Sequence, residues 1–229
     1  MPAVFFDLNA LVPNLKGAFQ EGVSAAFRTV DITLDEDMSL RALGKSYSEG
    51  VRAIYKEELG ISLPNEVRVG QLSGMYANVV HRFVQFSSSF FVSPLTAAIV
   101  EGLRIAGFQV GIITDLDAKT FDCLMGRLGW NPTDLFDTVV TSSDAKHKDA
   151  MLALLIGRFE LPTSGLRIFV GALAQDALPA HLHGCDRIFI RDLEQPSEDA
   201  RKEKLKFETF HSMTDLAEML RPQSLEAMR

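Results

Sequence analysis

From residue 94 onward, segments with the apolar spacing of a helix alternate with short, mostly apolar runs. This alternation is typical of a parallel β-sheet that is covered by helices. The first helix is predicted to begin at Pro94, after Ser93, and to end at Gly107, because proline favours the first helical position and glycine the position beyond the last. The sequence predicts strands at 108–114, 137–142, 166–171 and 186–192, the last of the sheet, and helices at 94–107, 120–129, 148–159, 176–183 and 212–221.

The first strand of this sheet lies far from the others in the sequence. Residues 3–7, AVFFD, have the apolar character of a strand buried on both faces, whereas residues 14–90 contain only helix-like segments. We therefore predict a doubly wound α/β core with a parallel sheet. The core domain comprises residues 1–13 and 90–229, and a helical domain is inserted at 14–89.

Composition and charge exclude several classes of partner. The 229 residues carry 23 Lys and Arg against 30 Asp and Glu, a formal net charge of −7, so no positive field draws the chain to nucleic acid or to an anionic membrane. No stretch approaches the roughly 18 apolar residues of a membrane span. Cys123 and Cys185 are expected to be free thiols. We expect a cytoplasmic protein without nucleic-acid or membrane partners.

Polar residues follow the predicted strands where a site would form. Asp7 ends the first strand, Thr114 ends the second, Lys148 follows the third and Asp176 follows the fourth. In an open parallel sheet, ligands bind just beyond the carboxyl ends of the strands. Each residue alone has a structural explanation as a cap, a turn former or a solvated side chain. Together they indicate a site made of two carboxylates, a hydroxyl and an ammonium.

This order of features resembles the haloacid dehalogenase superfamily of hydrolases, which use an aspartate nucleophile. The resemblance covers nearly the whole chain and places the family's helical cap at residues 14–89. It implies that Asp7 is the nucleophile, that Thr114 binds the transferring group and that Lys148 holds the nucleophile and offsets negative charge. The matching stretches are FFDLNALV, FQVGIIT, LFDTVVTSSD before Lys148, and IFVGALAQD.

The resemblance also implies a magnesium ion, which we expect this chain to bind weakly or not at all. Its ligands would be Asp7, Asp176 and the backbone carbonyl of Asn9. Phosphatases of the superfamily usually show Asp-x-Asp-Gly-Thr at the nucleophile, and this chain has Asn9 in place of the second acid. Ala172 stands in place of the main metal-binding carboxylate. An amide cannot protonate a leaving group, so we expect reduced or altered activity.

Two branches of the superfamily lack the second acid. The chain is similar to phosphonoacetaldehyde hydrolases in the cap segment LGKSYSEGVRAIY, although Tyr47 stands at the position of their Schiff-base lysine and Lys45 lies two residues away. The neutral loop GALAQD is similar to that of the 2-haloacid dehalogenases, which use no metal. A third alternative is a non-catalytic binding or scaffold protein with a protein partner.

The leading hypothesis is a hydrolase of a small phosphorylated or phosphonate substrate, phosphonatase-like in its subgroup. We expect a monomer or homodimer.

Overall fold

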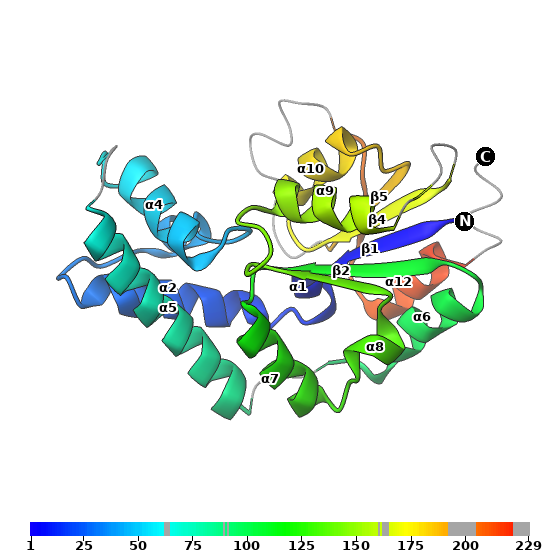
Figure 1. Cartoon of the computed structure of the whole chain (residues 1–229), viewed down its shortest axis with the longest axis horizontal. Helices are drawn as coiled ribbons and strands as arrows, with labels where there is room; N and C mark the ends of the chain where they lie inside the picture. The colour runs from blue at the N-terminus through cyan, green and yellow to red at the C-terminus, as the bar shows by residue number, and fades with distance from the viewer. Residues whose placement is uncertain are drawn as a thin grey trace.

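The computed structural model describes residues 1–61, 65–88, 90, 92–159, 161, 165–191 and 205–221. Six parallel strands form one sheet in the order β3-β2-β1-β4-β5-β6. Figure 1 shows β1 between β2 and β4. The first strand of the chain therefore lies inside the sheet, between strands that come more than 100 residues later. The strands are β1 Ala3–Asp7, β2 Gln109–Thr114, β3 Thr138–Thr141, β4 Arg167–Gly171, β5 Arg187–Arg191 and β6 Glu208–Phe210.

Helices cover both faces of the sheet, because successive side chains of a strand point to opposite faces. Ala3 and Phe5 belong to one buried apolar cluster, and Val4 and Phe6 belong to the other. Helices α9 and α10 lie on the first face, and α6, α8 and α12 lie on the second (Figure 1). The bounds are α6 Pro94–Ile105, α7 Ala118–Leu128, α8 Pro132–Leu135, α9 Lys148–Arg158, η1 Ala174–Asp176, α10 Ala177–Leu182 and α12 Met213–Met219.

The segment between β1 and α6 is a helical insert. Its helices are α1 Leu8–Leu11, α2 Leu15–Arg28, α3 Glu36–Leu40, α4 Tyr47–Glu57 and α5 Glu66–Phe86. Helix α2 packs along α5, and α5 also contacts α7 of the core. Phe19, Tyr47 and Tyr76 form an aromatic cluster inside the insert, with ring centroids 4.9–6.3 Å apart. Because these rings belong to the same apolar cluster as Val4 and Phe6, the insert and the core are packed against each other.

The α/β fold class predicted from the sequence is confirmed, and so are several helix starts. Pro94 begins α6, and the Ser93 side chain accepts a hydrogen bond from Leu95 N. One expectation was wrong, because strand β6 follows the strand expected to be last. Within the insert, a loop that contains Gly44 (φ 76°) joins α3 to α4. In the described part of the chain, none of the helices has the length and apolar character needed to cross a membrane.

The division into two domains at residues 13/14 and 89/90 stays a prediction. The helical insert lies between β1 and α6, as this division requires. Residue 89 is outside the described residues.

Candidate functional site

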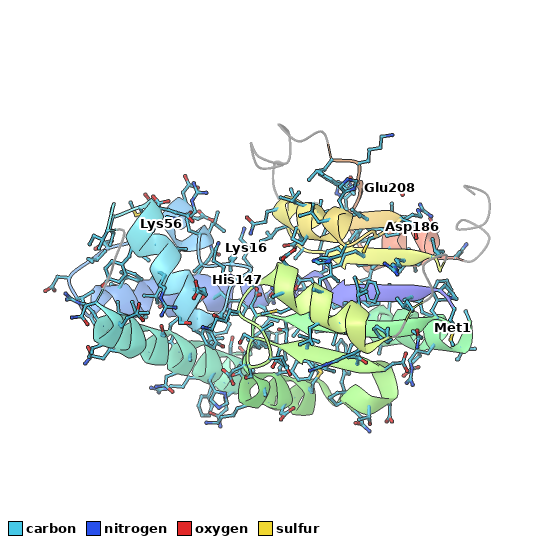
Figure 2. The ribbon with its side chains drawn as sticks, turned by 45° about the horizontal axis from the view of Figure 1, so that its top comes forward. Met1, Lys16, Lys56, His147, Asp186 and Glu208 are labelled. Atoms are coloured by element: carbon cyan, nitrogen blue, oxygen red, sulfur yellow. The ribbon has the colours of Figure 1, made fainter. Side chains whose placement is uncertain are left out.

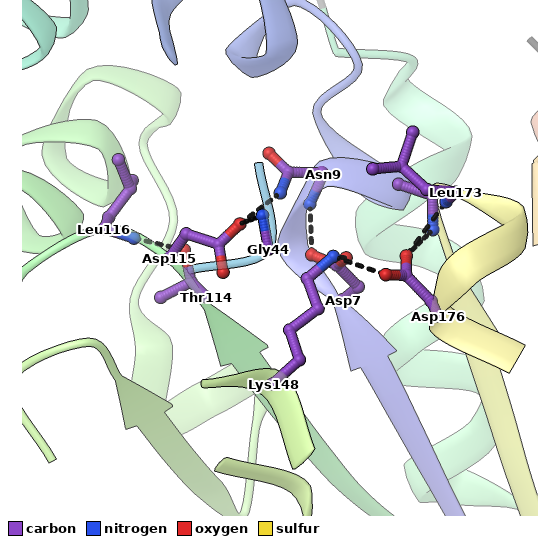
Figure 3. A network of polar contacts seen from close by, with 10 residues as sticks. Asp7, Asn9, Gly44, Thr114, Asp115, Leu116, Lys148, Leu173 and Asp176 are labelled. Carbon is purple, nitrogen blue, oxygen red and sulfur yellow. Dashed lines mark hydrogen bonds and ion pairs between the residues drawn. The ribbon is translucent and has the colours of Figure 1, made fainter. Parts of the chain in front are cut away.

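The four residues singled out at the strand ends lie at one edge of the sheet (Figure 3). Asp7 is the last residue of β1, and Thr114 is the last residue of β2 next to it. Lys148 begins α9, and Asp176 ends the short helix η1 after β4. The carboxyl ends of parallel strands meet at the same edge, which explains why residues so distant in sequence meet here.

Lys148 joins the two carboxylates. Its Nζ lies 2.5 Å from Asp7 Oδ2 and 2.8 Å from Asp176 Oδ1. All three side chains are buried, with 7%, 0% and 1% of their surface exposed. A lysine on the first turn of a helix is usually solvated, so this burial indicates a specific role in the site.

Backbone groups fix both carboxylates in place. Asp7 caps α1, and its Oδ1 accepts a hydrogen bond of 2.9 Å from Asn9 N. Asp176 Oδ2 accepts bonds from the backbone N–H groups of Ala172 (3.0 Å) and Leu173 (2.9 Å). Every oxygen of the two carboxylates therefore has a partner, and neither side chain is free to turn.

Thr114 lies beside this triad and bonds to its own loop. The hydroxyl accepts a hydrogen bond of 3.2 Å from Leu116 N. Within the described residues it donates to no other group, so its hydrogen is free for a ligand. The side chain is 1% exposed.

Asn9 makes a contact that the sequence did not predict. Its Nδ2 donates to Asp115 Oδ2 at 3.3 Å, while its Oδ1 is buried and has no partner in the part of the chain that the structure describes. Asp115 was not predicted from the sequence. The available signal was its position directly after Thr114, at a strand end, but there it resembles an ordinary turn former.

The loop between α3 and α4 closes over this edge. Gly44 N donates to Asp115 Oδ2 at 3.0 Å, and Ser46 N donates to Lys146 O at 2.9 Å. Lys45 and His147 form an antiparallel bridge. Figure 2 shows His147 on the side of the core that faces the helical insert. The insert thus contacts the site itself through this loop.

The burial of these charges shifts their protonation. Burial raises the pKa of Asp7 to about 7, although Lys148 opposes the shift. Burial also raises the pKa of Asp115. For Lys148, burial acts to lower the pKa, but Asp176, Asp7 and Asp115 outweigh it and raise the pKa above its ordinary value. The lysine is therefore charged at neutral pH, while Asp7 is ionised in only part of the molecules.

The donor atoms of the site do not suit a divalent cation. The ammonium of Lys148 lies between Asp7 and Asp176, and their remaining oxygens accept backbone N–H groups. Ala172 supplies a methyl group where the resemblance implies a carboxylate. In the ranges that the structure describes, no three His, Cys, Asp or Glu side chains are placed to hold a metal ion. Of the magnesium ligands implied at Asp7, Asn9 and Asp176, the two carboxylates thus have no oxygen without a partner in the described residues, and no step below depends on a metal.

Comparisons with known proteins reveal the fold. No family model and no curated protein matches the chain. Among solved structures, CbbY from Rhodobacter sphaeroides in complex with phosphate is 14% identical, with a TM-score of 0.74 and 99% of each chain covered.

A haloacid dehalogenase-like family hydrolase from Streptococcus pneumoniae is 15% identical, with a TM-score of 0.70 and coverage of 96% of this chain and 99% of that one. A phosphonoacetaldehyde hydrolase-like protein from Oleispira antarctica is 15% identical, with a TM-score of 0.69 and coverage of 96% and 93%. The chain therefore has the fold of the haloacid dehalogenase-like hydrolases.

Proposed function

We propose that this protein is a hydrolase that cleaves a small phosphorylated substrate through a covalent intermediate on Asp7. The observation that carries the proposal is the buried contact of Lys148 with Asp7 and Asp176. Burying three ionisable side chains together is costly, which favours a functional role for them over a purely structural one. The likeness to CbbY, solved with phosphate, supports a phosphorylated substrate.

In the proposed reaction, Asp7 attacks phosphorus and the alcohol part of the substrate leaves. The product on the enzyme is an acyl phosphate at Asp7. Water then attacks this phosphorus, which releases phosphate and restores the carboxylate. Lys148 offsets the negative charge that builds up on the phosphoryl oxygens, and the Thr114 hydroxyl donates a hydrogen bond to one of them.

The leaving group decides the rate in this site. Asn9 stands where a carboxylic acid would deliver a proton, and an amide has none to give. General acid catalysis contributes about 10²–10⁴ in rate, so esters of ordinary alcohols should react slowly. A substrate such as acetyl phosphate, whose leaving group needs no proton, should react well.

The phosphonatase-like subgroup has weaker support. Its chemistry needs a cap lysine that forms a Schiff base with an aldehyde. Tyr47 cannot do this, and Lys45 Nζ donates to the carbonyl of Arg41 at 2.7 Å. Burial lowers the pKa of Lys45, which favours an amine nucleophile, but the contact with Arg41 would have to break first.

A metal-free hydrolase acting at carbon is the second candidate. Two features favour it. Lys148 lies between the two carboxylates, and Ala172 supplies a methyl group where the resemblance implies a metal ligand. Displacement of a halide needs no metal. Asp7 would attack the carbon of a 2-haloacid and expel the halide. Water would then attack the carbonyl carbon of the resulting ester and restore the Asp7 carboxylate.

Turnover of acetyl phosphate, p-nitrophenyl phosphate and 2-chloropropionate, with and without Mg²⁺, tests these proposals. We expect turnover of acetyl phosphate that is lost in Asp7→Asn and kept in Asp122→Asn, which makes the same chemical change on the exposed face of α7. Chloride release alone would favour the second candidate. No turnover of any substrate would favour the non-catalytic alternative.

A further inference from the structure

We propose that Asp115 is a specificity-determining residue that binds a primary ammonium group of the substrate. The inference rests on the proposed function and names a substrate class for it: a small phosphorylated compound that also carries an amine. It starts from two atoms of the site that have no partner.

The carboxylate of Asp115 is half satisfied. Its Oδ2 accepts hydrogen bonds from Asn9 Nδ2 and Gly44 N, whereas its Oδ1 is buried and has no hydrogen-bond partner among the described residues. The residue is 1% exposed. Figure 3 shows the free oxygen turned away from Gly44 and Asn9. A buried acceptor without a partner costs roughly 1–3 kcal/mol, and more when it is charged, so the site is arranged to receive a donor there.

Asn9 provides a second free acceptor next to the first. Its amide orientation is determined by the contact with Asp115, because only the NH₂ group can face a carboxylate. The carbonyl Oδ1 is therefore left without a donor, and Asn9 is 8% exposed. Both free atoms accept hydrogen bonds, which excludes a second carboxylate of the ligand as their partner.

The balance of charge points to a cation. Asp7, Asp115 and Asp176 are each at most 2% exposed, and Lys148 is the one ammonium that contacts any of them in the described part of the chain. Lys45 lies nearby, but its ammonium binds the Arg41 carbonyl. Asp7 and Asp176 share the ammonium of Lys148, whereas none of the described cationic side chains forms an ion pair with Asp115, so a ligand ammonium would supply the counter-charge that Asp115 lacks.

Three phosphonates test the inference by binding, because each has a carbon–phosphorus bond in place of the phosphate ester bond that the enzyme would cleave. They are 2-aminoethylphosphonate, its isostere propylphosphonate, and 3-phosphonopropionate. We expect the aminophosphonate to inhibit acetyl phosphate turnover at a concentration at least tenfold lower than propylphosphonate, and the carboxylate to bind most weakly. Asp115→Asn should remove this preference, and Asp122→Asn should keep it.

The outcomes separate the two proposals. If acetyl phosphate turnover depends on Asp7 but the aminophosphonate binds no better than propylphosphonate, the inference about Asp115 fails and the proposed function stands. If no substrate is turned over, the shift in melting temperature with each phosphonate still measures the preference in the native protein. A rise in melting temperature with Mg²⁺ alone, lost in Asp115→Asn, would show that the site binds a metal instead and would overturn the inference.

Discussion

At the scale of single residues, the site is defined by an excess of buried negative charge around one lysine. Asp7, Asp115 and Asp176 surround Lys148, whose pKa they raise against the effect of burial. This arrangement is stable only while the lysine is present, because a buried carboxylate without a partner either loses stability or takes up a proton. The lysine therefore has a structural role as well as a catalytic one.

We expect Lys148→Met to lower the free energy of unfolding by about 3–5 kcal/mol, the usual cost of breaking a buried ion pair. The loss should be larger at pH 8 than at pH 5, because the abandoned carboxylates can take up protons at the lower pH. Urea unfolding at both pH values measures this. Lys119→Met, on the exposed side of α7, is the control and should change stability little. Equal losses for the two variants would contradict the burial of Lys148.

The raised pKa of Asp7 predicts the pH dependence of activity. Only the ionised carboxylate is a nucleophile, so kcat for acetyl phosphate should rise with an apparent pKa of about 7 and fall about tenfold per pH unit below it. The apparent value belongs to the interacting groups of Asp7, Lys148, Asp176 and Asp115 together. A rate that is constant from pH 5 to pH 8 would contradict the prediction.

The raised pKa of Asp7 also changes how stability depends on pH, in the direction opposite to that of most carboxylates. A carboxyl group whose pKa is raised on folding stabilises the native state fully below its unfolded pKa of about 4, and this contribution is lost as the pH rises through about 7. Between pH 5 and pH 8, wild type should therefore lose more stability than Asp7→Asn. Urea unfolding of both proteins at the two pH values measures the difference.

At the scale of elements, the loop between α3 and α4 carries the insert's contact with the site. Gly44 has a positive φ of 76°, and a Cβ at this position would lie 3.4 Å from Lys148 Cε. Gly60 also has a positive φ, of 67°, but a Cβ there would meet no atom within 4 Å. The two glycines thus share the left-handed backbone, and only Gly44 lies in contact with the site.

Gly44→Ala and Gly60→Ala should each lose about 1–2 kcal/mol of stability through left-handed backbone strain. Gly44→Ala should in addition lower acetyl phosphate turnover, because strain at this residue shifts the N–H group that donates to Asp115. Thermal unfolding and turnover of both variants provide the test. Equal turnover in the two variants would show that the loop does not position the site.

Regular patterns could be predicted from the sequence, and long-range contacts could not. The alternation of helices and strands predicted the sheet, and the strand ends predicted that Asp7, Lys148 and Asp176 would meet. Strand β6 was missed because three residues at an edge carry too short a pattern. Asp115 was missed because its partners Asn9 and Gly44 lie 106 and 71 residues away, and no local pattern predicts a contact at that distance.

At the scale of the whole molecule, the closed arrangement raises a problem of access. Asp7 is fully buried, and the insert bonds to the core around it at Gly44, Lys45 and Ser46. A substrate can reach Asp7 only if this loop separates from the core, which is the usual behaviour of a lid. Catalysis at this site is therefore expected to require movement of the insert.

A disulfide across the bridge between Lys45 and His147 tests this requirement. The two residues are paired in an antiparallel bridge, where the Cα separation is about 4.5–5.5 Å and suits a disulfide. In Lys45→Cys/His147→Cys, we expect oxidation to abolish acetyl phosphate turnover and a reductant to restore it, because the cross-link holds the loop on the core. Each single cysteine variant, oxidised in the same way, should stay active. Full activity of the cross-linked protein would mean that the substrate reaches Asp7 by a path that leaves this loop in place, and that the lid lies elsewhere in the insert.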